Sequence, residues 1–292
     1  MKIARHWVRE AVESPDATGR ILRAAAWGWS ATGVDEARRR ARDSAERVLA
    51  WLLDFSQAPM PPASGQYAYC EDRPPREEIV QEFHDAADEV SALITRNTYG
   101  SLVLNCRDLM FVDVDVKPSP LAEAKRLFGA LFGKRNAPAP AADAVLAGVR
   151  QWCADHGDIG ARLYRTAAGF RLAVVDRVMQ ADSPEARQML EQLGSDPLYR
   201  RLCEVQQCFR ARLTPKPWRM KMPQPPSRFP FADAAAEEQY RAWQRDYEAA
   251  APRYATCQFV EAHGPSTMHD DLAPLVQMHD SLTASTQELP LA

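Results

Sequence analysis

Residues 111–116 of this chain read Phe-Val-Asp-Val-Asp-Val, two carboxylates set in an apolar, mostly β-branched run. Side chains on a strand alternate between its two faces, so Asp113 and Asp115 point to the same side. Met110 and the intervening valines point to the other side, which predicts a buried face and a strand at the centre of a sheet. Enzymes that transfer phosphoryl groups hold divalent metal ions with paired carboxylates. We therefore expect Asp113 and Asp115 to ligate Mg²⁺ or Mn²⁺.

The composition is that of a globular protein. The chain has 292 residues, 46% of them hydrophobic, and a formal net charge of −3. Contact with DNA or RNA would therefore need a local basic patch, since the protein has no overall positive field. No export signal and no run of about 18 apolar residues is present, so we expect a soluble cytoplasmic protein without a membrane partner. The cysteines form no Cys-x-x-Cys pair and are expected to be reduced thiols.

Residues 1–55 predict a small β-β-α module. Strands are expected at 2–9 and 20–29, with a turn at 16–19 between them, and a helix at 34–55 follows from apolar residues at helical spacing. Thr32 and Asp35 resemble a capping box at the start of this helix.

The arginine-rich run at 38–42 has two interpretations. It can contact nucleic acid, or it can form a solvated helix face with ion pairs at i, i+4 spacing, and we favour the second. The pairs expected on this basis join Asp35, Glu36 and Asp43 to Arg39, Arg40 and Arg47.

Residues 56–75 predict a linker, and residues 76–230 predict the main α+β core. A helix is expected at 75–96 from apolar residues at helical spacing. Strands at 101–105 and 109–116 are expected to form a hairpin that carries the paired aspartates on its second arm.

A second hairpin is expected at 161–178, with arms at 161–166 and 170–176. Gly169 in its turn is expected to adopt a positive φ. The remaining predictions are helices at 121–132, 142–156, 183–193, 197–213 and 232–251, a loop at 214–230 with six prolines, and a helical extension at 231–292. The fold class is then α+β, with a central, mostly antiparallel sheet flanked by helices.

Two further stretches contain groups that bind phosphate. Thr166 and Arg171 flank the small-residue turn of the second hairpin, next to Arg165, and can hold phosphate oxygens. The alternative is an ordinary hairpin with surface arginines. Farther on, basic residues surround Trp218 and can bind phosphates and stack bases, or simply form a loop packed on the body of the protein. These five basic residues are Arg210, Arg212, Lys216, Arg219 and Lys221.

Together these stretches resemble the catalytic core of the archaeo-eukaryotic primase superfamily, over roughly residues 76–222. The family signature is a hydrophobic-Asp-hydrophobic-Asp strand, then a hairpin with a small residue, Gly and His, then a third carboxylate. The resemblance implies a metal-dependent nucleotidyltransferase, or a nucleotide- or nucleic-acid-binding protein, with Asp113, Asp115 and Arg171 at its centre. Arg171 stands where the family has its nucleotide-binding His, and Asp176 and Asp196 are candidates for the third carboxylate.

Three other functions remain open at this point. A non-catalytic interaction or regulatory protein with the same fold would explain the replacement of His by Arg171. A phosphoesterase would use the same aspartates with a different product. His263, His269 and the His279-Asp280 pair are typical of HD-type phosphohydrolases, although surface or capping histidines explain them more simply.

Overall fold

The computed structural model describes residues 1–54, 74–116 and 140–292. These residues divide into two compact units, one formed by Lys2–Glu77 and the other by Met1 with Glu78–Ala292. The predicted helix at 121–132, Cys70 and most of the predicted linker lie outside the described residues. Each unit is described by itself below.

The Lys2–Glu77 unit is a two-stranded antiparallel ribbon packed on one helix, as predicted. Its elements are β1 (His6–Pro15), β2 (Ile21–Ser30) and α1 (Val34–Leu53). Ala37 and Ala41 of α1 are fully buried against the ribbon. Gly28 allows this close packing, because a Cβ at this position would lie 2.1 Å from the Ala37 carbonyl oxygen.

The start of α1 differs from the predicted capping box. Gly33 is the N-cap and makes no side-chain capping bond, whereas the Ser30 hydroxyl accepts from the Thr32 and Gly33 amides at 2.9 and 3.1 Å. The arginine-rich face of α1 is an ion-paired surface, as predicted, but of the three expected pairs only Glu36–Arg40 is found among the described residues. The pairs are Arg38–Asp35 at 2.8 Å, Arg40–Glu36 at 2.9 Å and Arg42–Glu46 at 3.1 Å.

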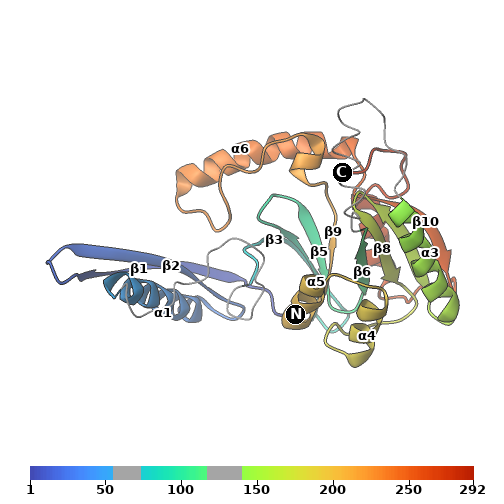
Figure 1. Ribbon diagram of the computed structural model, residues 1–292, viewed down its shortest axis with the longest axis horizontal. Helices are drawn as coiled ribbons and strands as arrows, with labels where there is room; N and C mark the ends of the chain where they lie inside the picture. The colour runs from blue at the N-terminus through green and yellow to red at the C-terminus, as the bar shows by residue number, and fades with distance from the viewer. Residues whose placement is uncertain (55–73, 117–139) are drawn as a thin grey trace. The chain divides into compact units, whose positions relative to one another are not determined.

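The larger unit contains two four-stranded antiparallel sheets, not the single central sheet that the sequence predicts (Figure 1). The first sheet has the order β3-β4-β5-β9. Its strands are β3 (Glu78–His84), β4 (Val90–Arg96), β5 (Leu102–Cys106) and β9 (Phe209–Arg212). The helix predicted at 75–96 is wrong, because Asp85 accepts from the Ala87 and Glu89 amides at 2.9 and 3.0 Å and turns the chain between β3 and β4.

The second sheet has the order β10-β7-β8-β6 and carries the aspartates. Its strands are β6 (Phe111–Asp115), β7 (Ala161–Thr166), β8 (Gly169–Val174) and β10 (Cys257–His263). The β7–β8 hairpin is confirmed. Gly169 does not have the predicted positive φ; it is needed because a Cβ there would lie 2.1 Å from the Val114 carbonyl oxygen of β6.

The hairpin predicted between 101–105 and 109–116 is wrong. Strand β5 pairs with β4 and β9, and β6 pairs with β8, so the chain passes from one sheet to the other between Cys106 and Phe111. Among the described strands β6 therefore lies at an edge of its sheet, although Val112 and Val114 are buried.

Five helices accompany these sheets in the described part of the larger unit. They are α3 (Pro140–Asp155), α4 (Pro184–Gln192), α5 (Pro197–Gln206), α6 (Ala234–Ala250) and α7 (Ala273–Leu282), with short 3₁₀ turns η1 (Pro217–Met220) and η2 (Ala251–Arg253). Figure 1 shows α3 beside β10, where Arg150 and Glu261 pair at 2.6 Å. The helix predicted at 197–213 is too long, because Gln207 adopts a left-handed conformation and β9 follows.

Residues 231–292 contribute more than the predicted helical extension. Besides α6, they supply β10, which pairs with β7, and α7, which packs through His279 against Phe111 and Tyr164 of the second sheet with ring centroids 5.0 Å apart in both cases.

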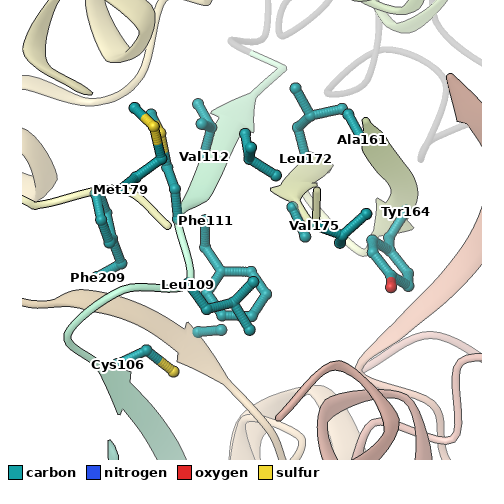
Figure 2. Packing of buried hydrophobic residues seen from close by; sticks show 14 of the residues in the cluster. Cys106, Leu109, Phe111, Val112, Ala161, Tyr164, Leu172, Val175, Met179 and Phe209 are labelled. Atoms are coloured by element: carbon teal, nitrogen blue, oxygen red, sulfur yellow. The ribbon is translucent and has the colours of Figure 1, made fainter. Parts of the chain in front are cut away.

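The main hydrophobic core spans both sheets of the larger unit. Figure 2 shows part of it, with Phe209 of β9 on one side of Phe111 and Tyr164 of β7 on the other. The described cysteines are buried and form no disulfide with one another. None of the described helices is long and apolar enough to span a membrane.

The hydroxyl of Tyr199 on α5 joins the two sheets where β6 and β9 meet. It lies 2.8 Å from the Phe111 carbonyl oxygen of β6 and 3.0 Å from that of Arg210 in β9, and it accepts from the Arg210 amide at 3.2 Å. One buried hydroxyl thus satisfies backbone groups that the strands of each sheet leave unpaired.

We expect Tyr199→Phe to lower the free energy of unfolding by about 1–3 kcal/mol, because it leaves buried backbone groups without a partner. Urea unfolding followed by circular dichroism measures the change. Tyr254→Phe is the matched control, since the Tyr254 hydroxyl has no hydrogen bond within the described ranges. Equal stability of the two variants would show that Tyr199 does not hold the sheets together.

Candidate functional site

A forked ion pair between Arg171 and Asp113 lies at the centre of the candidate site. The two residues are direct neighbours across β8 and β6. Arg171 Nε donates to Asp113 Oδ1 at 2.7 Å, and Nη2 donates to Oδ2 at 3.0 Å. The Arg171 side chain is 2% exposed and that of Asp113 is 39% exposed. The arginine is therefore covered while its partner reaches the surface.

The third nitrogen of the Arg171 guanidinium points to other elements. Nη1 donates to the Arg212 carbonyl oxygen at 3.0 Å and lies 3.3 Å from His279 Nε2. Arg171 thus contacts β6, β9 and α7 at once. In this arrangement its guanidinium is occupied by protein groups, and it does not present a free fork to a phosphate as the sequence predicts.

The two aspartates have opposite pKa shifts. Burial raises the pKa of Asp113, but the charge and hydrogen bonds of Arg171 outweigh burial, so this pKa lies below its ordinary value. Desolvation and the nearby charge of Asp113 raise the pKa of Asp115 above its ordinary value, although Lys216 and Arg219 oppose the shift. Asp113 is therefore a committed ion-pair partner, and Asp115 is the carboxylate that remains open to a ligand.

A buried network extends from Arg171 along the same face of the sheet. His279 is fully buried, with Nδ1 3.1 Å from Asp280 Oδ1. Since Arg171 can only donate, His279 Nε2 must accept and Nδ1 must carry the proton, which makes the imidazole neutral. Asp280 in turn accepts from Arg162 at 2.8 Å, and Arg162 donates to the Tyr164 hydroxyl at 2.8 Å.

Three cations lie close to the aspartates, and we call Arg212, Lys216 and Arg219 the cationic cluster. Desolvation and the charges of Arg212 and Arg219 lower the pKa of Lys216 to about 8, with Asp115 and Asp113 opposing the shift. Desolvation and the neighbouring cations likewise lower the pKa of Arg212. Within the described ranges no Asp or Glu carboxylate lies within 4.0 Å of these three cationic groups. Arg212 Nη1 donates to the Thr214 and Ala292 oxygens at 3.4 and 3.5 Å. The cluster is thus an accumulation of positive charge without a close Asp or Glu partner in the described part of the chain, although Asp113 and Asp115 partly compensate it.

The loop before η1 is fixed by α6. The Tyr247 hydroxyl of α6 donates to the Pro215 carbonyl oxygen at 2.6 Å, and the Ser101 hydroxyl donates to the same oxygen at 2.7 Å. These bonds hold the backbone directly before Lys216. The loop predicted at 214–230 is therefore ordered by specific contacts at its start, in addition to the stiffness of its prolines.

Aromatic rings lie beside the cationic cluster. Trp218 is 46% exposed, and its ring packs edge-on against Tyr99 with centroids 5.2 Å apart. Lys216 Nζ lies 5.4 Å from the centre of the Trp218 ring. Arg219 Nη1 is buried and has no hydrogen-bond partner among the residues that the structure describes. A buried N–H group without a partner costs free energy that an anionic ligand would recover.

The other predicted phosphate ligands lie elsewhere. The Thr166 hydroxyl accepts from the Ala168 amide at 3.3 Å within the hairpin turn. Arg165 follows Tyr164 on β7 and so points to the opposite face from the ion pair. Arg210 is buried and donates to Gln206 of α5 at 2.8 Å. The structure therefore unites Asp113, Asp115, Arg171 and the cationic cluster, but not these three residues.

The described residues do not form a complete metal site. They contain no group of three or more His, Cys, Asp or Glu side chains arranged to hold an ion. Both oxygens of Asp113 accept from Arg171, which leaves Asp115 as the open ligand. Of the two candidates for a third carboxylate, Asp176 pairs with Arg177 at 2.9 Å. Asp196 caps α5, and its charge helps to raise the pKa of Asp115.

Sequence reasoning missed Tyr199 and the role of His279. The expectation of surface or capping histidines is wrong for His279, because it is buried in the network, whereas His263 pairs with Glu261 at 3.4 Å and His269 with Asp271 at 3.8 Å. A signal for His279 was its place among apolar residues in a short helix, next to Asp280. Tyr199 had no comparable signal.

This chain matches no protein-family model, no curated protein and no solved structure. What it does must be inferred from its own residues.

We expect Asp113→Ala to lower the free energy of unfolding by about 3–5 kcal/mol, because it leaves the buried Arg171 charge without its partner. Asp115→Ala is the matched control on the same strand and should change stability by less than about 1 kcal/mol. Replacing both partners, in Asp113→Ala/Arg171→Met, should cost less than Asp113→Ala alone. Urea unfolding of the three variants measures these differences, and equal losses for Asp113→Ala and Asp115→Ala would contradict the role of the pair.

We also expect protein stability to fall as the pH drops below about 6.5, where His279 would protonate in the unfolded chain. Burial and the charge of Arg171 lower the pKa of His279, with Asp280 and Asp113 opposing the shift. Because the pKa of His279 is lower in the folded state, the unfolded state binds more protons as the pH falls. The stabilisation of the fold by neutral His279 is therefore complete above about pH 6.5 and decreases below it. His279→Gln should flatten the dependence of the melting temperature between about pH 7 and pH 5, while replacement of the exposed His84 by Gln should not. An unchanged slope in His279→Gln would refute this assignment.

Proposed function

We propose that this protein binds nucleotides or a nucleic-acid strand through their phosphates at the cationic cluster. The observation that carries this proposal is the accumulation of Arg212, Lys216 and Arg219 without an Asp or Glu carboxylate within 4.0 Å in the described part of the chain. A ligand with several negative charges is the natural counterpart of such a cluster.

The energetics of the cluster support a polyanionic ligand. Arginines elsewhere in the chain form close ion pairs, as Arg96 does with Glu248 at 2.7 Å and Arg200 with Glu191 at 2.7 Å. Desolvation, and after it the repulsion from Arg212 and Arg219, lowers the pKa of Lys216. Phosphate oxygens would remove this repulsion and give the Arg219 Nη1 hydrogens an acceptor.

The aromatic residues favour a ligand that carries a base. The exposed Trp218 ring is held by Tyr99 at one edge and has the Lys216 ammonium nearby. Stacking of a base on such a ring is worth about 1–3 kcal/mol and tolerates any sequence. Phosphates on the cations and a base on Trp218 would place a nucleotide across η1.

The same geometry favours binding without turnover. Asp113, the first carboxylate of the proposed primase-like motif, has both oxygens engaged by Arg171. Where the family has His, Arg171 therefore neutralises the Asp113 carboxylate that a metal ion would need. On this proposal the chain is a non-catalytic relative of the primase core.

Metal-dependent nucleotidyl transfer is the second candidate. One observation favours it: Asp113 and Asp115 share a face and lie close enough for the charge of Asp113 to raise the pKa of Asp115. A phosphoesterase that uses the same two aspartates fits this observation equally well.

We expect Lys216→Ala and Arg219→Ala each to weaken binding of ATP and of a fluorescein-labelled single-stranded oligothymidylate by about tenfold, since each removes a charge-assisted contact. Lys221→Ala is the matched control, because Lys221 is an exposed cation on the same loop. Trp218→Ala should weaken binding of ATP more than binding of inorganic triphosphate. Calorimetry and fluorescence anisotropy measure these affinities.

Lys216 adds a pH readout to the same experiment. Because its pKa is about 8, affinity should fall between about pH 7 and pH 9 as the ammonium loses its proton. Lys216→Arg should remove this fall. Absence of binding, or equal loss in Lys221→Ala, would refute the proposed site. Release of pyrophosphate from a labelled triphosphate with Mg²⁺ or Mn²⁺, lost in Asp115→Asn, would instead establish transfer, and release of phosphate would establish a phosphoesterase.

A further inference from the structure

The β1–β2 ribbon of the Lys2–Glu77 unit has one face against α1 and one face directed away from it. The odd-numbered side chains form the second face, which we call the outer face. It consists of Trp7, Arg9, Ala11 and Glu13 of β1 and Ile21, Arg23, Ala25, Trp27 and Trp29 of β2. Even-numbered residues face α1, as the Arg38–Glu10 contact at 3.6 Å and the packing of Gly28 against Ala37 show.

The outer face has large apolar side chains at its ends and the small side chains of Ala11 and Ala25 in its middle. Ile21 is 59% exposed, which is unusual for a large aliphatic side chain. Two tryptophans of this face have a cation nearby within the described part of the unit. The Arg76 guanidinium lies 5.9 Å from the centre of the Trp27 ring, and the Arg40 guanidinium of α1 lies 4.4 Å from that of Trp29. The outer face is rich in Trp and Arg and poor in acidic residues. This composition is typical of protein–protein interfaces rather than of solvent-exposed strands.

The residues of the outer face are arranged symmetrically about one cross-strand pair. Ala11 lies opposite Ala25 at the middle of the ribbon. Arg9 opposite Trp27 comes on one side of this pair, and Glu13 opposite Arg23 comes on the other. A rotation by 180° about the line that joins the two alanines therefore exchanges Arg9 with Glu13 and Trp27 with Arg23.

This symmetry makes the face complementary to itself. In a face-to-face stack of two antiparallel ribbons, Arg9 of one copy lies over Glu13 of the second. Arg9 has no ion pair within the described residues, and the Glu13–Arg23 pair at 3.4 Å has both side chains more than half exposed. The alanines at the axis let the two sheets approach closely, and Ile21 meets the end of the partner ribbon that carries Trp7.

We propose that the outer face binds a second copy of this chain, with the two ribbons stacked antiparallel about Ala11 and Ala25. Antiparallel stacking also keeps the chain connections apart, since Arg5 pairs with Ser30 and Arg76 lies near Trp27 at the same end of each ribbon. The face is only about 33 Å long and two strands wide, so the dimer belongs to the weak class with a dissociation constant in the micromolar range.

Charge reversal in the full chain tests the central contacts. Arg9→Glu or Glu13→Arg alone places like charges at two symmetric positions and should weaken dimerisation by about tenfold or more. The double variant Arg9→Glu/Glu13→Arg restores unlike charges and should dimerise as the wild type does. Sedimentation velocity up to roughly 0.1 mM measures the association, and circular dichroism confirms that each variant is folded.

Cross-linking tests the axis itself. Ala11→Cys should form a disulfide-linked dimer under mild oxidation, because the symmetry places this position next to itself in the partner. Ala17→Cys, exposed in the turn between β1 and β2, is the matched control and should cross-link more slowly. A monomeric wild type over the whole concentration range, unchanged association after single charge reversal, or equal cross-linking of the two cysteines would overturn the proposal.

Discussion

The buried guanidinium of Arg171 is the constraint on which the larger unit depends. A fully enclosed cation is stable only when every donor has a partner, and Arg171 obtains its partners from three elements that are distant in sequence: Asp113 on β6, the Arg212 carbonyl on β9 and His279 on α7. The two sheets are consequently joined by directional polar contacts, with the Tyr199 hydroxyl as a second link, and not by one continuous ladder of strand hydrogen bonds.

Local sequence signals predicted those parts of the fold in which one element packs on its nearest neighbours. The β-β-α unit and the β7–β8 hairpin follow from periodicity and turn residues within short windows. The helix expected at 75–96 failed because the same apolar residues also fit two strands, and the Asp85 turn between them decided the outcome. The partner of β6 was not readable, since the chain crosses between sheets after only a few residues and nothing local specifies β8 instead of β5.

The candidate site was predictable in part. The alternation of Phe111–Asp115 placed both aspartates on one face, and the density of basic residues around Trp218 located the cationic cluster. The pairing of Asp113 with Arg171 depends on strand register, which the sequence alone does not define. Arg210 illustrates the same limit: it is two residues from Arg212, yet it bonds Gln206 and so serves α5.

Arg212 takes part both in the contacts between the sheets and in the cationic cluster. Its carbonyl oxygen accepts from Arg171, while its guanidinium lies in the cluster. If the cluster binds a polyanion as proposed, its occupancy and the cohesion between the sheets are thermodynamically linked, because a ligand that fixes Arg212 also fixes the acceptor on which Arg171 relies. Binding of such a ligand would then increase the rigidity of the described part of the larger unit.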